Sequence, residues 1–472
     1  MKSGIASLSL RLFFVILLCA FASSAYAQYS FDALRLATLY PGQDPYNMSL
    51  GSSSAASYQG LGSVMVNPAV AGMADRSMVT FGFGVRDVSQ TTLYPGLESM
   101  VLDERRPHHA VQQNFDDQQT GITHAGFIYK VPTVIGSLAI GGGYHQTAVY
   151  NSAYKIDFFN QHSSRTYQFL TEYQDLFDLA FDTFTIDNVY GEYESIFDFG
   201  GFMGVGQYAE VTQRGQAGEY NLFLSTEFQE DFFVGISVGV PVSNSSYEYF
   251  FIEESPLDNN GNPIYSGEAF TGSYNIDQVL FEEKVNVDAI GINARIGLLY
   301  TGFSLFDIGV SYTTRTRWNV DETFDVFLQT RFWDVVTYDG DVIVDDQDRT
   351  FGPVINDSFR GEYSYSLNTP SRFYVGASTD ALPFMNLSFT AERVDYSRIK
   401  LRDFDTVDRE IEISENNFIS NNFKDVWNFR AGAAITVFDW MEPRLGWAWV
   451  RNPINYLEDN ERHFFSAGLG IG

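Results

Sequence analysis

The chain has 472 residues, and its 59 acidic and 29 basic side chains give a formal net charge of −30 at pH 7. This excess of carboxylates argues against nucleic acid as a partner, because binding to nucleic acid depends on Lys and Arg side chains that meet phosphates. The only cysteine, Cys19, lies within an apparent export signal. A mature chain without thiols excludes disulfides, thiolate metal sites and cysteine nucleophiles.

Residues 1–27 have the features of a secretory signal peptide. Lys2 and Arg11 supply positive charge, residues 12–21 are apolar, and Ala25-Tyr26-Ala27 is a cleavage site of the small-x-small type. The pattern therefore predicts export from the cytoplasm followed by removal of this segment.

The mature protein is expected to begin at Gln28. A lipoprotein signal in which Cys19 is lipidated is the alternative, but Leu18 is bulkier than the small residue usual at that position. No later stretch has about 18 uninterrupted apolar residues, so insertion into a membrane would have to use strands in a closed barrel.

Residues 28–78 differ in character from the rest of the mature chain. Residues 52–63 are rich in Ser, Gly and Ala, and residues 64–73 contain the triplet Asn67-Pro68-Ala69. Strand alternation is missing, and the glycines allow tight turns. The segment is predicted to be compact and irregular, with short helices, and to pack against another part of the protein.

Residues 79–472 repeat one pattern, in which apolar residues alternate with small or polar ones over about ten residues before a turn follows. The clearest examples are residues 289–300, 306–312 and 429–437. One apolar side and one small or polar side predict an all-β fold, a transmembrane antiparallel β-barrel. The predicted strands are 78–85, 122–131, 137–150, 197–212, 218–228, 232–250, 267–282, 287–301, 303–318, 322–338, 360–368, 371–380, 384–399, 426–438, 441–452 and 463–472.

The longest predicted connection, residues 151–200, is acidic and aromatic. The spacing of Phe169, Tyr173, Phe177 and Leu179 is loosely helical and predicts a short amphipathic helix over the barrel mouth.

A serine hydrolase pattern, G-x-S-x-G, occurs at residues 235–239. That chemistry needs a strand-to-helix elbow that exposes the serine, together with an acid and a histidine later in the chain. Here Ser237 lies in the middle of a predicted strand, and the only later histidine is His463. We interpret Ser237 as a lumen-facing structural residue, and we expect no enzymatic activity, no cofactor and no metal site.

Three arginines are predicted to point into the lumen, namely Arg295, Arg430 and Arg444, because each is in phase with small or polar residues of its strand. An inward arginine can hold a carboxylate head group by a bidentate, charge-assisted bond. The alternative is that each arginine pairs with an acid of the lumen, such as Asp307 or Glu392, and stiffens the wall.

The chain resembles the FadL/TodX family of outer-membrane transporters in three places. Asn67-Pro68-Ala69 is similar to the NPA motif of the family's N-terminal hatch. Residues 294–324 are similar to a family hairpin that ends in a basic-aromatic-acidic run, and residues 423–449 are similar to its penultimate strands. The resemblance implies a barrel of about 14 strands, formed here by residues 79–472 and plugged by a hatch at residues 28–78.

The chain ends at Gly472, about two strands earlier than the family pattern, so C-terminal strands are expected to be missing. The resemblance further implies a monomer in the bacterial outer membrane, in contact with its lipid, that passively transports hydrophobic small molecules, above all long-chain fatty acids or hydrocarbons, and releases them laterally. Phe158, Phe159 and Phe181 are candidates for external capture, since burying each CH₂ gains about 0.8 kcal/mol.

The sequence is also compatible with other functions and folds. The alternative function is that of a barrel component or shuttle of a protein-secretion system, which would have a protein partner. A barrel esterase and a secreted soluble β-sandwich are further alternatives.

Overall fold

The structure, a computed structural model, describes residues 24–40, 44–92, 113–170, 174–189, 191–198, 201–257, 264–269, 272–333, 337–338, 341–342, 354–382, 384–404, 409–438, 440–457 and 461–472. Most of the predicted signal peptide lies outside these residues. None of the described helices is long and apolar enough to cross a membrane.

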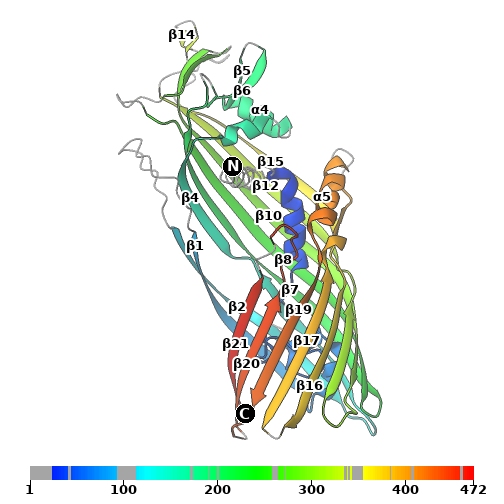
Figure 1. Ribbon diagram of the computed structural model, residues 1–472. Helices are drawn as coiled ribbons and strands as arrows, with labels where there is room; N and C mark the ends of the chain where they lie inside the picture. Colours follow the sequence, from blue (N-terminus) through cyan, green and yellow to red (C-terminus); the bar gives the residue numbers. More distant parts are fainter. Residues whose placement is uncertain are drawn as a thin grey trace, which may run out of the picture.

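One antiparallel sheet of 19 strands dominates the described fold, and β5 pairs with β6 in a separate hairpin (Figure 1). The prediction of an all-β antiparallel fold is confirmed. The strands are β1 (Met78–Thr92), β2 (Gln113–Val131), β3 (Leu138–Val149), β4 (Ser152–Asn160), β5 (Ile186–Val189), β6 (Glu192–Ser195), β7 (Val205–Gln229), β8 (Phe232–Glu254), β9 (Ser266–Ala269), β10 (Gly272–Tyr300), β11 (Asp307–Thr313), β12 (Arg317–Phe332), β13 (Thr337–Tyr338), β14 (Asp341–Val342), β15 (Val354–Asn368), β16 (Arg372–Leu382), β17 (Met385–Asp395), β18 (Lys400–Arg402), β19 (Asp425–Ile435), β20 (Met441–Val450) and β21 (Arg462–Ile471).

The sheet curves into a wall around the N-terminal segment (Figure 1). β11 and β12 form one pass along the wall and β15 and β16 the next, because β11 pairs with β16 and β12 pairs with β15. If successive strands that continue one another along the wall are counted as one pass, the described residues form twelve passes. The resemblance implies a barrel of about 14 strands. Among the same residues, β21 and β1 are not paired with each other.

Several strands extend beyond the predicted ranges, among them β1, β2, β7 and β10. The expected breaks at residues 213–217 and 283–286 are wrong, because β7 and β10 run through them without interruption. Arg214 and Lys284, charged residues within these stretches, lie on paired strands and are exposed. Lys284, for example, is paired in register with Glu248 of β8 and Asp325 of β12.

The outward face of the wall changes character along each strand. On β10, Ile292 and Ile296 are about half exposed, and residues 290–300 present an apolar outer face. The next outward residue, Asp288, accepts a 2.6 Å hydrogen bond from the Asn244 amide of β8. The apolar stretch matches the ≈ 9–11 residues that a strand needs to cross a bilayer, and the sheet continues beyond it.

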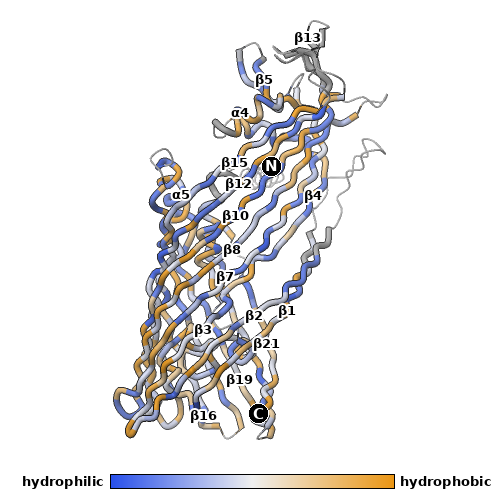
Figure 2. The backbone as a smooth tube through the Cα atoms, turned by 180° about the vertical axis from the view of Figure 1, so that it is seen from behind, coloured by the Kyte–Doolittle hydropathy of each residue, from blue (hydrophilic) through white to orange (hydrophobic). Residues whose placement is uncertain are grey.

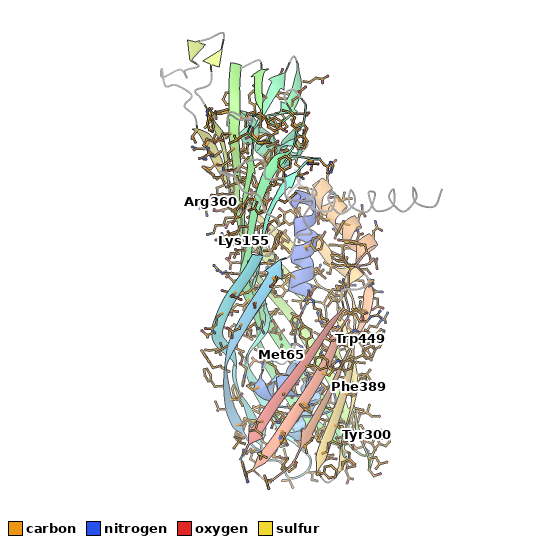
Figure 3. All side chains as sticks on the ribbon, turned by 60° about the vertical axis from the view of Figure 1, so that its left-hand side comes forward. Met65, Lys155, Tyr300, Arg360, Phe389 and Trp449 are labelled. Carbon is orange, nitrogen blue, oxygen red and sulfur yellow. The ribbon has the colours of Figure 1, made fainter. Side chains whose placement is uncertain are left out.

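Figures 2 and 3 show this division of the wall. Tyr300, Phe389 and Trp449 lie along the lower part of the wall, whereas Lys155 and Arg360 lie higher (Figure 3). The part of the wall that carries Lys155 and Arg360 is an upper extension outside the apolar band.

The inner face of this extension is covered by a cap made of η3 (Arg165–Leu170), α4 (Gln174–Asp182) and the β5–β6 hairpin. Of the predicted helix, Phe177 and Leu179 lie in α4, Phe169 belongs to η3, and Tyr173 lies outside the described residues. Glu253 of β8 anchors this cap, because its carboxylate accepts hydrogen bonds from the Ser164 hydroxyl at 2.5 Å and the Arg165 N–H at 2.8 Å. An apolar core forms between the cap and the sheet, and it includes Phe169, Leu179, Ile186, Phe197, Phe251, Tyr265, Phe281, Leu328 and Phe332.

The N-terminal segment lies inside the curved sheet and consists of α2 (Ser24–Ala37), α3 (Pro45–Ser49), η1 (Leu61–Met65) and η2 (Pro68–Met73). Helix α2 stands beside α5 (Arg409–Asn422) in the upper part of the lumen (Figure 1). The buried side of α2 packs on an apolar cluster of the wall that contains Val287, Trp318, Val320, Tyr365, Leu367, Val394 and Leu401.

Candidate functional site: a lumen filled by the N-terminal segment

Glycines of the wall allow the N-terminal segment to approach the strands closely. A Cβ atom at Gly297 would collide with the Asn67 amide, and one at Gly309 would collide with the Ala55 carbonyl. The same holds for other inward glycines, which are paired in register as Gly235–Gly297, Gly309–Gly376 and Gly432–Gly446. The small residues of the alternating pattern are therefore required where backbone packs on backbone.

Hydroxyl side chains of the wall supply hydrogen-bond partners between these glycines. The backbone of the N-terminal segment is irregular, so many of its buried polar groups need partners outside the segment. The contacts are Ser311 Oγ to the Val66 carbonyl at 2.5 Å, Ser378 Oγ to the Ala56 carbonyl at 3.0 Å, Ser225 Oγ to the Ala69 carbonyl at 2.8 Å, and the Ala55 N–H to Thr390 Oγ1 at 3.1 Å.

The Asn67-Pro68-Ala69 triplet joins the N-terminal segment to the wall. Asn67 caps η2, because its Oδ1 accepts the Ala69 N–H at 3.0 Å, and Pro68 occupies the first turn. The Asn67 amide nitrogen donates to the Ala55 carbonyl at 2.6 Å and to the Leu298 carbonyl of β10 at 3.1 Å. One buried side chain thus connects two parts of the segment and a strand.

The first predicted arginine, Arg295 of β10, holds a carboxylate of the chain itself. Its Nη1 and Nη2 atoms both donate to Glu219 of β7, the latter at 2.8 Å, and Asn293 donates to the same carboxylate at 3.1 Å. All three side chains are buried. The pair is bidentate, the geometry in which an arginine binds a carboxylate most strongly.

The second predicted arginine, Arg430 of β19, shares a buried glutamate with another arginine. Glu392 of β17 accepts from Arg430 at 2.9 Å, from Arg372 of β16 at 2.5 Å, from the Tyr374 hydroxyl at 2.8 Å and from the Asn428 amide at 3.1 Å. Four donors on one carboxylate balance the cost of burying its charge.

The third predicted arginine, Arg444 of β20, contacts the N-terminal segment. Its guanidinium lies 3.7 Å from the centre of the Tyr46 ring of α3, a cation–π contact, and its Nε donates to Glu442 at 2.6 Å. All three arginines therefore have an acid partner, as the alternative interpretation expected. Glu392 was named for that role, whereas Glu219 and Glu442 were not.

The structure does not bring the three arginines into one pocket. Arg295 and Arg372 line a polar cavity of about 10 Å³ together with Thr147, Thr313, Thr316 and Thr369, and the described lining includes neither Arg430 nor Arg444. A cavity of this size holds about one water molecule. Sequence analysis missed Arg372, although its phase with Tyr374 and Ser378 was a usable signal.

The three aromatic residues predicted to capture ligand are also separated. Phe158 and Phe159 are neighbours on β4, so their side chains point to opposite faces of the sheet. Phe181 lies on α4, is 37% exposed and contacts the Tyr193 ring edge-on at 5.8 Å. They do not form one patch.

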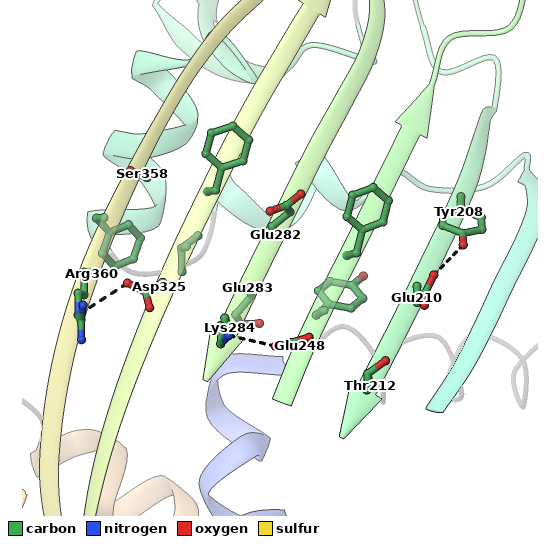
Figure 4. A pocket seen from close by; sticks show the side chains of 15 residues that line it. Tyr208, Glu210, Thr212, Glu248, Glu282, Glu283, Lys284, Asp325, Ser358 and Arg360 are labelled. Carbon is green, nitrogen blue, oxygen red and sulfur yellow. Dashed lines mark hydrogen bonds and ion pairs between the residues drawn. The ribbon is translucent and has the colours of Figure 1, made fainter. Parts of the chain in front are cut away.

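The largest hollow among those described, about 780 Å³, lies on the outer face of the upper extension (Figure 4). Charged pairs cross it from strand to strand, with Lys284 3.1 Å from Glu248 and Arg360 3.7 Å from Asp325. Exposed pairs of this kind stabilise by only about 0–1 kcal/mol each. We interpret this face as a solvated surface above the apolar band.

No family model and no curated protein sequence matches the chain. Among solved structures, a Pseudomonas aeruginosa FadL homologue matches with a TM-score of 0.50 and 11% sequence identity, over 92% of this chain and 87% of that one. The chain has the FadL-type fold.

Two further solved structures match with lower TM-scores. The Pseudomonas putida toluene transporter TodX matches with a TM-score of 0.46 and 12% identity, over 88% of this chain and 84% of that one. The CymD monoaromatic hydrocarbon channel matches with a TM-score of 0.43 and 13% identity, over 91% of this chain and 88% of that one.

Proposed function

We propose that this protein is a monomeric conduit of the bacterial outer membrane that passes hydrophobic small molecules, with long-chain fatty acids as its cargo. The observation that carries the proposal is an apolar outer band on a wall whose interior is filled by a separate segment of the chain. An apolar band of that height lets the wall contact lipid. A segment that fills the interior can control whether molecules pass through.

The membrane placement follows from the outward residues. Residues 290–300 of β10 are apolar outside, and the polar outward residues Asn244, Asp288 and Asp321 are in register on β8, β10 and β12. A change from apolar to polar outward residues along a strand is typical of the edge of a bilayer. Export to this location uses the signal peptide at residues 1–27.

The N-terminal segment, residues 28–78, is proposed as the hatch that closes the lumen. Besides apolar packing, it is held to the wall by separate side-chain hydrogen bonds, each with a net worth of about 0.5–1.5 kcal/mol, whereas neighbouring strands are joined by continuous ladders of backbone hydrogen bonds. The hatch is therefore the part that can shift while the wall stays intact, and cargo then leaves laterally into the membrane.

Cargo entry is proposed at the cap. Phe181 and Tyr193 are both partly exposed there, next to an apolar core outside the apolar band. Diffusion down a concentration gradient suffices, so transport needs no cofactor. Phe158 and Phe159 serve the same role only if the cap rearranges, because they lie on opposite faces of β4.

Recognition of a carboxylate head group is proposed at Arg295, Arg430 and Arg444. Each arginine already holds a carboxylate of the chain, so an acid ligand must replace Glu219, Glu392 or Glu442. Such an exchange keeps the arginine paired with a carboxylate, and the displaced glutamate must take up a proton or reach water. A neutral hydrocarbon has no means to make this exchange.

The test is binding of a labelled long-chain fatty acid and of a labelled neutral aromatic hydrocarbon to detergent-folded protein. The double variant Arg295→Gln/Glu219→Gln removes the pair without leaving an unpaired buried charge, and Arg393→Gln, on the outer face, is the matched control. We expect saturable fatty-acid binding that the double variant weakens about tenfold, a loss of about 1.4 kcal/mol. Binding of neither ligand would overturn the proposal and favour the secretion component.

A further inference from the structure

Helix α2 and helix α5 are joined by a buried contact. The backbone N–H of Ser30 donates to Glu415 Oε2 at 2.9 Å, and the Ser30 hydroxyl donates to the same oxygen. Both residues are buried, with exposed fractions of 0% and 1%. Glu415 is thus a carboxylate that meets a backbone N–H of a neighbouring helix.

This contact has the geometry of a helix start. Within a helix, a backbone N–H normally donates to the carbonyl four residues earlier. The N–H groups that lack such a partner are those of the first turn, and a carboxylate near them is favoured by the helix dipole as well. Ser30 nevertheless lies in the seventh position of α2, which begins at Ser24.

Removal of the signal peptide after Ala27 would place Ser30 in the first turn of α2, where such a contact is expected. Gln28 then becomes the first residue, and Ser30 becomes the third residue of a helix whose first turn faces Glu415. In helical geometry the amino nitrogen of Gln28 lies within about 5 Å of the Ser30 nitrogen. The new ammonium group is therefore delivered next to a buried carboxylate.

Asp32, four residues after Gln28, is a second buried carboxylate of this region. Asp32 is 8% exposed, and its Oδ2 is buried without a hydrogen-bond partner among the described residues, while Oδ1 pairs with Arg35. Side chains four residues apart lie on one helix face and lean toward the N-terminus. Asp32 consequently leans toward Gln28, with one oxygen available for an additional donor.

We propose that Glu415 and Asp32 form a binding site for the amino terminus that signal-peptide removal creates at Gln28. Charge-assisted hydrogen bonds from the ammonium group would satisfy the free oxygen of Asp32 and pair the buried charge of Glu415. Processing would then fix the upper end of α2 against α5. The proposal rests on the cleavage position given above and is independent of the cargo.

The test uses the chemistry of an N-terminal glutamine. The amine of Gln28 attacks its own side-chain amide, the amide C–N bond breaks, ammonia leaves, and pyroglutamate forms. The attack needs the lone pair of the neutral amine, so an ammonium group held by carboxylates reacts slowly. Intact-mass measurement first establishes the start of the purified mature protein, and peptide mass spectrometry then follows the loss of ammonia.

We expect wild-type protein to cyclise about tenfold more slowly than Glu415→Gln, with Asp32→Asn in between, because charge-assisted bonds hold the ammonium form. Glu410→Gln, at an exposed position of the same helix, should behave like wild type. A change in gel migration on heating that equals that of wild type shows that each variant has folded. A start other than Gln28, or equal rates in folded wild type and Glu415→Gln, would overturn the proposal, whether or not the protein transports fatty acids.

Discussion

Arg372 of β16 donates one guanidinium nitrogen to the carbonyl of Ala37, the last residue of α2, and another to Glu392 at 2.5 Å. A cation at the carbonyl end of a helix also interacts favourably with the helix dipole. One side chain therefore connects the lower end of α2 to the buried charge network of the wall.

Replacing Arg372 with Met should loosen α2. We expect a destabilisation of about 3 kcal/mol, the low end for a broken buried pair, because Arg430 still holds Glu392. Hydrogen–deuterium exchange of peptides covering residues 29–40 should become faster.

The control for Arg372→Met is Arg393→Met. Arg393 pairs with Asp425 at 2.6 Å, but the pair lies on the exposed face and contributes about 0–1 kcal/mol. Equal protection of residues 29–40 in wild type and Arg372→Met would contradict the role given to Arg372.

The glycine contacts predict a sharp difference between two Gly→Ala substitutions. Gly297→Ala places a methyl group against the Asn67 amide, whereas Gly121 of β2 has no atom near the corresponding position. Overpacking should cost about 1–3 kcal/mol at Gly297 and little at Gly121. Thermal unfolding in detergent measures the difference, and equal melting temperatures would show that the hatch does not press on the wall.

Asn67 can be tested by separating its two hydrogen-bonding roles. Asn67→Asp keeps an acceptor for the Ala69 N–H but loses the donor that the Ala55 and Leu298 carbonyls need. Asn67→Ser keeps the cap without placing a charge against those carbonyls. We expect Asn67→Asp to be less stable than Asn67→Ser by about 1–3 kcal/mol, because both variants lose the amide donor but only the aspartate places a buried charge against the two carbonyls. Equal stability of the two variants would show that the cap alone matters.

The strands were predictable because alternation is a local property. Residues 289–300 show the pattern plainly, and the structure places them in β10. Prediction failed at residues 213–217 and 283–286, since outward charges look the same in a solvated strand and in a turn. No local sequence pattern distinguishes a strand that continues beyond the membrane from one that ends in a turn there.

The candidate site was only partly predictable. The phase of Arg295 gave its inward direction, but its partner Glu219 lies on β7, and that pairing depends on the register of β7, β8 and β10. The same limit applies to Arg372, whose second partner is a helix carbonyl. Phe158 and Phe159 were grouped by sequence proximity, although adjacent strand residues face opposite ways.

Glu415 predicts a pH dependence of stability. In the uncleaved chain, burial raises the pKa of Glu415 to about 7, and hydrogen bonds from Ser30 oppose that rise only partly. The folded state then keeps a proton that the unfolded state releases near pH 4.5, so the free energy of unfolding falls as pH rises between these values. The melting temperature should fall across this window.

Glu415→Gln should reduce that slope, because the amide does not titrate. Protein that begins at Gln28 should also have a smaller slope, since its ammonium group stabilises the ionised carboxylate. A slope identical in all three proteins would exclude Glu415 as its source.

The most direct measurement uses a disulfide between the hatch and the wall. The hydroxyls of Ser53 and Ser388 lie 2.6 Å apart, and the expected mature chain has no cysteine of its own, so Ser53→Cys/Ser388→Cys offers one bridge. Cells that carry this variant would be supplied with labelled long-chain fatty acid before and after mild reduction. We predict uptake at the level of cells lacking the protein when the bridge is closed, and full uptake once it is reduced. Equal uptake in both states would contradict the proposed hatch, and no uptake in either would contradict the proposed conduit.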